Sequence, residues 1–142
     1  MSDQDNILTP DLIVKKMYDN DDFSQWLGIE FLNVAKGSCS IKMTVRTEMT
    51  NGFNVAHGGI SFSLADSAFA FASNSLGKHA VSIETSISHV KPVFVGDILI
   101  AIAEAQNVSN SLAIFSVKVK NQDDKTVALF KGTVFRKNEY WT

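Results

Sequence analysis

Residues 51–75, NGFNVAHGGISFSLADSAFAFASNS, contain the most informative pattern in the sequence. From residue 58 to residue 77, Asp66 is the only residue charged at neutral pH, and apolar side chains surround the whole circumference of the helix that this stretch predicts. A helix that is apolar on every side is buried. A membrane-spanning helix is the competing interpretation, but Asp66 and the many serines would be costly in lipid. The stretch therefore predicts a buried helix at the centre of the fold.

The segments on both sides of this helix predict strands. Residues 29–37 and 38–47 alternate apolar and polar side chains, which indicates a hairpin. Thr9-Pro10 precedes that hairpin and begins a short amphipathic helix to about residue 20. After the long helix, short turn-like separators favour antiparallel strands at about 80–93, 97–107, 112–121 and 126–137. The order predicts an α+β fold in which a curled antiparallel sheet wraps around one long central helix.

Length and composition describe one domain over residues 1–142. The chain is 45% apolar and 20% charged, so it can bury a core of ordinary size. Its formal net charge of -2 supplies no field for holding a phosphate backbone, which argues against nucleic-acid binding. A single cysteine excludes an internal disulfide, and the chain has no cationic start followed by an apolar signal core. We therefore expect a cytoplasmic protein that binds neither nucleic acid nor a membrane.

Asp66 is the strongest candidate for a chemical role. An ionised carboxylate in an otherwise uncharged buried helix is costly unless it is paired or lies in a cleft. No Lys or Arg lies within a helical turn of it. Hydrogen bonding to Ser63, Ser67 or a neighbouring strand is the structural alternative, and a functional carboxylate is the favoured interpretation.

His57, Gly58 and Gly59 come directly before the body of this helix. The first N–H groups of a helix have no intrahelical partner and lie at the positive end of its dipole, so they can bind an oxyanion. Glycine lets a substrate carbonyl approach the backbone closely, as acyl transfer requires. Eight helical residues span about 12 Å, so Asp66 cannot easily reach a carbonyl at Gly58 of its own chain. If both groups act, Asp66 comes from a second subunit.

The other candidate functional residues have weaker support from the sequence. Asn51 either forms a simple turn with Gly52 or places an amide near the glycines. Cys39 lies in an alternating strand without an obvious basic partner. His79 and His89 lack the spacing of metal ligands, so no metal site is predicted. A P-loop and a Gly-x-Gly-x-x-Gly turn are both absent, which leaves nucleotide hydrolysis and dinucleotide chemistry without support.

The chain resembles a known family in the stretch quoted first and in three others. These are MYDNDDFSQWLGIEFL (17–32), KPVFVGD (91–97) and KTVALFKG (125–132). Together they are similar to the PaaI-like, phenylacetic acid degradation branch of the hot dog-fold acyl-CoA thioesterases, and the resemblance extends from about Met17 to Arg136. It implies the hot dog fold, a homodimer that assembles into a homotetramer, and hydrolysis of acyl-CoA thioesters.

The resemblance also assigns roles by position in the motif. It implies Asp66 as nucleophile or general base, and Gly58 as the N–H that polarises the thioester carbonyl. Asn51 is implied as a contact to the carboxylate, the nucleophile or water. His57 and Ser67 are implied as supporting residues near the thioester, and no cofactor is needed.

Different residues are expected to bind the coenzyme A moiety and the acyl group of the substrate. Lys91 stands where relatives commonly have arginine before the proline, and it retains the charge without the bidentate fork. Arg136 belongs to a basic C-terminal stretch, which is either a solvated strand face or a contact to the phosphates of a ligand. As a ligand contact, both cations are assigned to the coenzyme A moiety. The resemblance favours phenylacetyl- or hydroxyphenylacetyl-type acyl groups. The candidate pocket residues, each with ordinary core packing as the alternative, are Phe53, Phe62, Phe69 and Phe94.

Two other functions stay open. A noncatalytic acyl-CoA-binding module on the same fold would keep the pocket without needing Asp66. A hot dog hydratase or dehydratase would need a paired His and Asp, and the sequence shows no such pair at suitable spacing.

Overall fold

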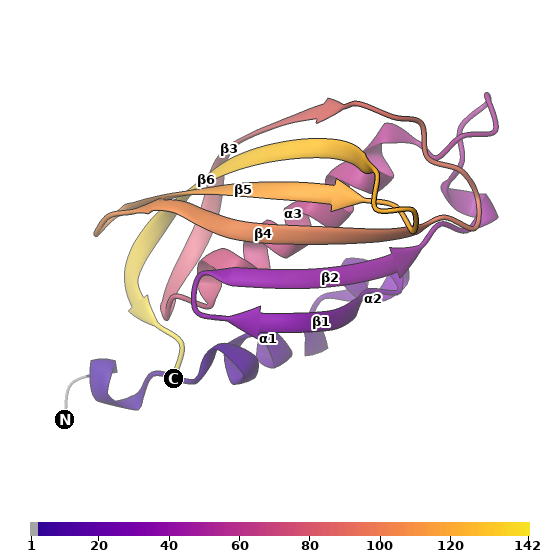
Figure 1. The fold of residues 1–142 in the computed structure, drawn as a ribbon. Helices are drawn as coiled ribbons and strands as arrows, with labels where there is room; N and C mark the ends of the chain where they lie inside the picture. The colour runs from indigo at the N-terminus through magenta and orange to yellow at the C-terminus, as the bar shows by residue number, and fades with distance from the viewer. Residues whose placement is uncertain (1–2) are drawn as a thin grey trace.

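A computed structural model describes residues 3–142 (Figure 1). The predicted short helix at residues 10–20 and the predicted long central helix are both present. The elements in chain order are η1 (Asp3–Asn6), α1 (Pro10–Asp19), α2 (Asp22–Leu27), β1 (Glu30–Ala35), β2 (Ser38–Thr44), η2 (Thr47–Met49), α3 (Gly58–Asn74), β3 (Lys78–His89), β4 (Ile98–Val108), β5 (Leu112–Lys120) and β6 (Thr126–Tyr140).

The six strands form one sheet in which every neighbouring pair is antiparallel. Their order is β1-β2-β4-β5-β6-β3. The sheet curls around α3, while α1 and α2 lie beside the β1 edge (Figure 1). The strand that follows α3 therefore pairs at the far edge, and β4 returns to pair with β2. This arrangement confirms the predicted hot dog architecture.

α3 packs closely on the concave face of the sheet, where alanines on the helix and a glycine on the sheet leave room for a phenylalanine ring. Ala65, Ala68 and Phe69 on α3 are at most 1% exposed. A Cβ on Gly132 of β6 would lie only 2.6 Å from the Phe69 ring. The glycine therefore makes room for that ring, and it sets how closely the helix approaches the sheet.

The structure differs from the sequence prediction at several element ends and in one helix that was missed. α3 ends at Asn74 instead of near residue 77, because the chain turns at Gly77, whose φ is 111°. β3 ends at His89 instead of near residue 93, since Pro92 cannot donate to a strand ladder. α2 was not predicted, although its N-cap Asp21 and its left-handed C-cap Gly28 are ordinary helix signals.

The β3 edge of the sheet is open along its length. β3 has 12 residues and pairs on one side only, with β6. Its Val81 and Ile83 side chains are 42% and 58% exposed. An edge strand of this kind offers unpaired N–H and C=O groups to another chain.

Within residues 3–142, no helix is both long enough and apolar enough to cross a membrane.

Candidate active site

The first turn of α3 contains one N–H group without a partner. His57 is the N-cap, and its Nδ1 accepts a hydrogen bond from the Gly59 N–H at 2.9 Å. Because Nδ1 accepts this bond, the proton of the neutral ring is on Nε2. No group within residues 3–142 accepts a hydrogen bond from the Gly58 N–H. Capping of Gly59 therefore leaves Gly58 as the free donor at the positive end of the helix.

The loop before α3 is held in place by hydrogen bonds. The Ala56 N–H donates to the Val93 carbonyl at 2.7 Å, which ties this loop to the loop after β3. Asn51 Oδ1 accepts from the Phe53 N–H at 2.9 Å and forms the predicted turn. In the described part of the chain, the Asn51 amide NH₂ has no hydrogen-bond partner. The oxygen of Asn51 thus has a structural role, and its NH₂ group is free to bind a ligand.

Asp66 lies on the less buried side of α3, and its side chain is half-buried. Burial raises the pKa of its carboxyl above the ordinary value, because desolvation disfavours the charged form. Its carboxylate has no ion pair or hydrogen bond to any residue from 3 to 142, so the hydrogen-bonding alternative is wrong. The same residues contain no group of three or more His, Cys, Asp or Glu that could hold a metal ion. The carboxylate is therefore free for chemistry.

Ser67 lies where α3 meets α2. Its hydroxyl is 2.9 Å from Ser24 Oγ, and Ser24 Oγ donates to Asp21 Oδ2 at 2.6 Å. The Ser67 hydroxyl is therefore the donor in its bond to Ser24. Asp21 also accepts the Ser24 N–H at 2.9 Å and caps α2. This chain of hydrogen bonds fixes α2 alongside α3.

A cavity of about 380 Å³ lies between α2, η2 and the first turns of α3. Its α2 wall consists of two stacked aromatic rings, Phe23 and Trp26, whose centroids are 5.9 Å apart. A mostly apolar cavity with a few polar groups is typical of a small-molecule site. The lining residues are Phe23, Trp26, Glu48, Met49, Thr50, His57, Gly59, Ile60 and Ser63.

None of the four phenylalanines proposed from the sequence lines this cavity. Phe69 is 1% exposed in the core, and Phe62 packs edge-on against Phe130 with centroids 5.6 Å apart. Phe53 and Phe94 are 87% and 50% exposed. The aromatic residues on α2 were missed, although two aromatics three residues apart after a capping aspartate are a recognisable helical pattern.

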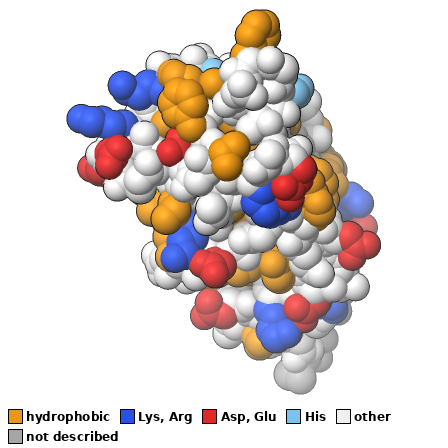
Figure 2. All heavy atoms as spheres, turned by 90° about the vertical axis from the view of Figure 1, so that its right-hand side faces the viewer, with side chains coloured by type: hydrophobic (Ala, Val, Ile, Leu, Met, Phe, Trp, Pro, Cys, Tyr) orange, Lys and Arg blue, Asp and Glu red, His pale blue; other side chains and the backbone are white. Residues whose placement is uncertain are grey.

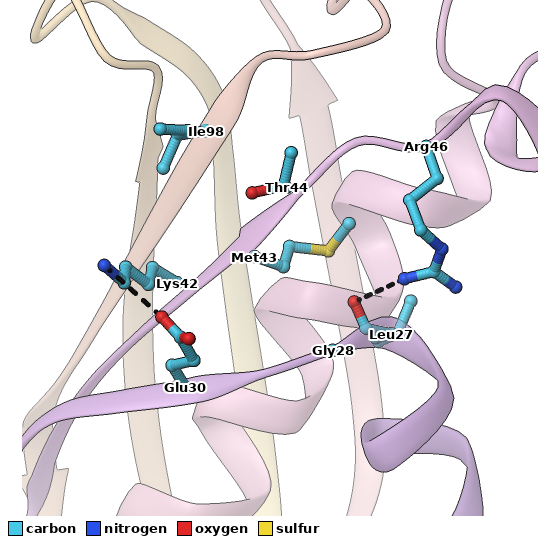
Figure 3. Close-up of a pocket in the computed structure, with 8 residues that line it drawn as sticks. All are labelled: Leu27, Gly28, Glu30, Lys42, Met43, Thr44, Arg46 and Ile98. Atoms are coloured by element: carbon cyan, nitrogen blue, oxygen red, sulfur yellow. Dashed lines mark hydrogen bonds and ion pairs between the residues drawn. The ribbon is translucent and has the colours of Figure 1, made fainter.

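Arg46 holds the end of α2 that carries Trp26. Its guanidinium donates to the Leu27 carbonyl at 3.2 Å and to the Trp26 carbonyl at 2.6 Å, and it lies 5.0 Å from the centre of the Trp26 ring. Figure 3 shows the bond to Leu27 beside a smaller cavity of about 160 Å³. The ion pair between Lys42 and Glu30, 3.3 Å long, lines the same cavity. This smaller cavity contains no predicted site residue.

The two cations assigned to coenzyme A lie far apart. Lys91 is exposed and follows the end of β3, near the loop that precedes α3. Arg136 pairs with Ala80 near the start of β3, and it donates to the Ser109 carbonyl at 2.6 Å. Residues 80 to 89 of a strand span about 30 Å. One chain therefore does not bring both cations to the same phosphate group.

Apolar side chains are exposed at the end of the molecule where α3 begins. Figure 2 faces this end and shows hydrophobic side chains at the surface with charged groups between them. Trp26 is 47% exposed and Val95 is 49% exposed. Exposed apolar groups beside a cavity are typical of a surface that binds a ligand or another protein.

Comparison with known proteins relates this geometry to other chains. Residues 53–128 match the Thioesterase superfamily. The chain is 46% identical to a protein of Archaeoglobus fulgidus over 87% of this chain and 80% of that protein. It is 41% identical to the acyl-coenzyme A thioesterase PaaI of Escherichia coli, over 84% of this chain and 86% of PaaI.

Solved structures give a similar result. The structure of Escherichia coli PaaI matches with a TM-score of 0.91 at 38% identity, covering 94% of this chain and 96% of that one. A Streptococcus mutans protein solved with bound acetyl CoA matches with a TM-score of 0.77 at 26% identity, over 80% of this chain and 91% of that one.

Proposed function

The chain belongs to the thioesterase superfamily, in its PaaI-like hot dog branch, and is an acyl-CoA thioester hydrolase; we propose that it acts on small aromatic acyl groups and uses Asp66 as its reactive carboxylate. The observation that carries the proposal is the unpaired Asp66 carboxylate on α3, the helix whose first turn leaves the Gly58 N–H free. A noncatalytic module would gain nothing from such a carboxylate, because its burial is costly when it is ionised.

Gly58 polarises the thioester carbonyl in this proposal. Its N–H is free because His57 caps Gly59 instead, and the positive end of the helix dipole lies at the same place. Negative charge develops on the carbonyl oxygen when the carbonyl carbon is attacked. A preorganised donor of this kind contributes about 10²- to 10³-fold to kcat.

Asp66 supports two routes that balance chemically. As a nucleophile, its carboxylate bonds to the carbonyl carbon, the C–S bond breaks, the thiolate takes a proton from water, and water then hydrolyses the anhydride. As a general base, it takes a proton from water, the hydroxide attacks, and the proton ends on the departing thiolate. Rapid quenching followed by mass measurement separates them: an acyl adduct on Asp66 identifies the nucleophile, and ¹⁸O from water found only in the released acid, without an adduct, identifies the base.

The complete site needs a second chain. Asp66 and Gly58 lie about 12 Å apart along one helix, so they cannot act on the same thioester within one protomer. The open β3 edge and the half-buried side of α3 are the surfaces that support a homodimer. We include in the proposal the homodimer and its assembly into a homotetramer.

The acyl group occupies the 380 Å³ cavity beside α2 in this proposal. The cavity begins at His57 and Gly59, next to the Gly58 N–H, and its far wall is the Phe23–Trp26 pair. Flat aromatic walls favour an aromatic ring by stacking as well as by burial. A phenylacetyl or hydroxyphenylacetyl group has the size and shape that such a cavity accepts.

The coenzyme A moiety leaves the site past the loop that carries Lys91. Acetyl CoA bound to a related Streptococcus mutans protein supports a coenzyme A thioester as the substrate. Lys91 is exposed and close in sequence to Val93, which is bonded to the loop before α3.

We also propose that the enzyme acts in phenylacetate degradation and that it is cytoplasmic.

Thiol release from a panel of thioesters tests the proposed activity. We expect higher kcat/KM for phenylacetyl-CoA and benzoyl-CoA than for acetyl-CoA and butyryl-CoA. Equal turnover of all four would contradict the aromatic preference, and no turnover of any would contradict thioester hydrolysis.

Replacement of Trp26 sharpens this test. Trp26→Leu removes the stacking wall and keeps an apolar side chain, so we expect kcat/KM for phenylacetyl-CoA to fall about 10-fold while that for acetyl-CoA stays unchanged. Leu12→Ala, an exposed apolar change on α1, is the matched control. An equal loss for both substrates would place the acyl group elsewhere.

A further inference from the structure

His89, the last residue of β3, lies directly against the first turn of α3. A Cβ built on Gly58 would be 3.3 Å from His89 Nε2 and 3.6 Å from Cε1. Ile87, two residues earlier, packs against the core, so His89 is on the strand face that faces the helix. The end of the strand is held by the Val90 N–H, which donates to the Val127 carbonyl at 2.9 Å. The His89 backbone is therefore held in place, with the imidazole beside Gly58.

The His89 side chain is exposed, and it has no hydrogen bond or ion pair to any residue between 3 and 142. The two other histidines each have a side-chain contact. His57 caps α3, and His79 stacks on Trp141 with ring centroids 4.2 Å apart. Among the three, only His89 has neither a side-chain hydrogen bond nor an aromatic stack within the described part of the chain.

The geometry allows His89 and Gly58 to bind one oxygen together. The Cβ of a residue is about 2.5 Å from its own amide nitrogen, so the Gly58 nitrogen and His89 Nε2 are at most about 5.8 Å apart. Two donors that each lie about 2.9 Å from a shared oxygen can be separated by up to about 5.8 Å. A carbonyl oxygen that accepts the Gly58 N–H is thus within reach of the imidazole.

A second donor at this place is needed because the helix supplies only one. The Gly59 N–H already donates to His57 Nδ1, so it cannot bind the oxyanion. We propose that His89 is a catalytic residue that donates the second hydrogen bond to the thioester carbonyl oxygen, alongside the Gly58 N–H. This inference rests on the proposed function, since it uses the same substrate carbonyl.

The contact also explains why residue 58 is glycine. Alanine would keep the N–H, but its Cβ would press on the imidazole at 3.3 Å, which is closer than ordinary van der Waals contact. Gly58→Ala should therefore lower activity by displacing His89, although the backbone donor remains. Gly58 is then required for the position of a neighbouring side chain as well as for close approach of the substrate.

The test compares three variants at residue 89 in steady-state hydrolysis of phenylacetyl-CoA. We expect His89→Ala to lower kcat about 10²-fold while KM changes little, because the bond strengthens only as charge develops on the oxygen. His89→Gln, whose amide N–H can replace the Nε2 donor, should recover most of that loss, and His89→Phe should not. Ser88→Ala, an exposed change at the adjacent position, is the control and should leave kcat unchanged.

A double-substitution cycle makes the test specific to the contact. The loss caused by Gly58→Ala in the wild-type background should disappear in the His89→Ala background, because the displaced group is already gone. Independent losses that multiply would overturn the proposal. A wild-type kcat in His89→Ala, or a change confined to KM, would overturn it as well.

The leaving group separates this role from proton donation to sulfur. A more acidic thiol needs no proton from the enzyme, so a loss in His89→Ala that shrinks with a thiophenyl ester would assign His89 to the sulfur and overturn the carbonyl assignment. An equal loss with both esters is the expected result. Wild-type protein without any thioesterase activity would overturn the proposed function and this inference together, whereas a His89→Ala variant with the wild-type kcat would overturn this inference alone.

Discussion

The polar groups at the two ends of α3 differ in how fully they are hydrogen-bonded. At its carboxyl end, Asn74 is 4% exposed and uses its amide fully: it donates to the Ala70 carbonyl at 2.9 Å and accepts from the Ala80 N–H and the Trp141 indole, both at 3.0 Å. Ser75 next to it is equally well bonded: its Oγ accepts from the Gly37 N–H at 2.9 Å. These groups join the helix to the strands around it.

The first half of the same helix contains polar groups that lack partners within residues 3–142. The Gly58 N–H donates to nothing, and the Asp66 carboxylate accepts nothing. Folded proteins satisfy nearly all of their buried polar groups, so the unsatisfied carboxylate of the half-buried Asp66 needs a reason. The polar groups at the carboxyl end of α3 therefore stabilise the fold. Those in its first half stay available to bind a substrate or a second chain.

Asp66→Asn, in the first half of α3, should cause the largest loss of activity. The change keeps the shape and removes only the anion, so we expect kcat to fall about 10³-fold with the fold intact. Stability at pH 7 should not decrease, because burial already disfavours the charged carboxylate. Thiol release and thermal unfolding measure the two effects.

Asp123→Asn, in an exposed turn, is the charge-matched control for this experiment and should leave kcat unchanged. Near wild-type turnover in Asp66→Asn would remove Asp66 from the mechanism.

Mixed dimers should show that the two unpaired groups come from different chains. Gly58→Pro removes the N–H at a position whose backbone accepts proline, since His57 has an extended ψ of 138° and the first helical position needs no donor. The proline Cβ also meets His89 of the same chain, so the change disables only that chain's half of the site. The Gly58→Pro and Asp66→Asn homodimers should both be inactive. After co-refolding and random reassociation, about a quarter of wild-type activity should return, because half of the dimers are mixed and each has one complete site.

Background activity in dimers that native mass measurement confirms as mixed would mean that both groups serve one chain. Gly58→Ala is not a neutral control here, because its Cβ would contact His89. The Gly58→Pro protein should therefore be checked by its unfolding transition and its oligomeric state.

Asn74→Ala, at the carboxyl end of α3, should lower the stability of the fold without changing the catalytic rate. It leaves the Ala80 N–H and the Trp141 indole without their acceptor, so we expect the free energy of unfolding to fall by about 3 kcal/mol. kcat should stay unchanged wherever the protein is folded. Denaturant titration measures the loss, and Asn107→Ala, an exposed amide on β4, is the control. A large fall in kcat at temperatures well below unfolding would contradict the division between the two halves.

The pH dependence should show the smallest effect. Asp66 must be ionised to act, and its pKa is raised by burial, so the acid limb of kcat/KM should lie above the ordinary aspartate range. Stability should respond in the opposite sense. The contribution of the protonated carboxyl is fully present below the pKa of the unfolded chain and is lost as the pH rises through the raised folded pKa.

Thermal unfolding at a series of pH values checks this linkage. The gain in stability of Asp66→Asn over the wild type should grow as the pH rises through the folded pKa. A difference that does not depend on pH would show that the pKa of Asp66 is the same in the folded and unfolded chain.

Local patterns in the sequence were sufficient to predict the central helix, most strands and the carboxylate. The all-round apolar run predicts burial of α3 whatever packs against it, and alternation predicts the strands because side chains of a strand point to opposite faces in turn. Asp66 stands out because it is the only charge in that run. The resemblance added the fold family, which the sheet order confirms.

The tertiary structure alone decided which distant residues meet. Sequence spacing left His89 without a partner, yet the pairing of β3 with β6 places it against Gly58. The same sheet separates Lys91 from Arg136, and Arg46 holds the Trp26 wall of the cavity from another element. The physical reason is that caps and periodicity depend on neighbours a few residues away, whereas these contacts depend on strand order and register, which only the packing of the whole chain around α3 determines.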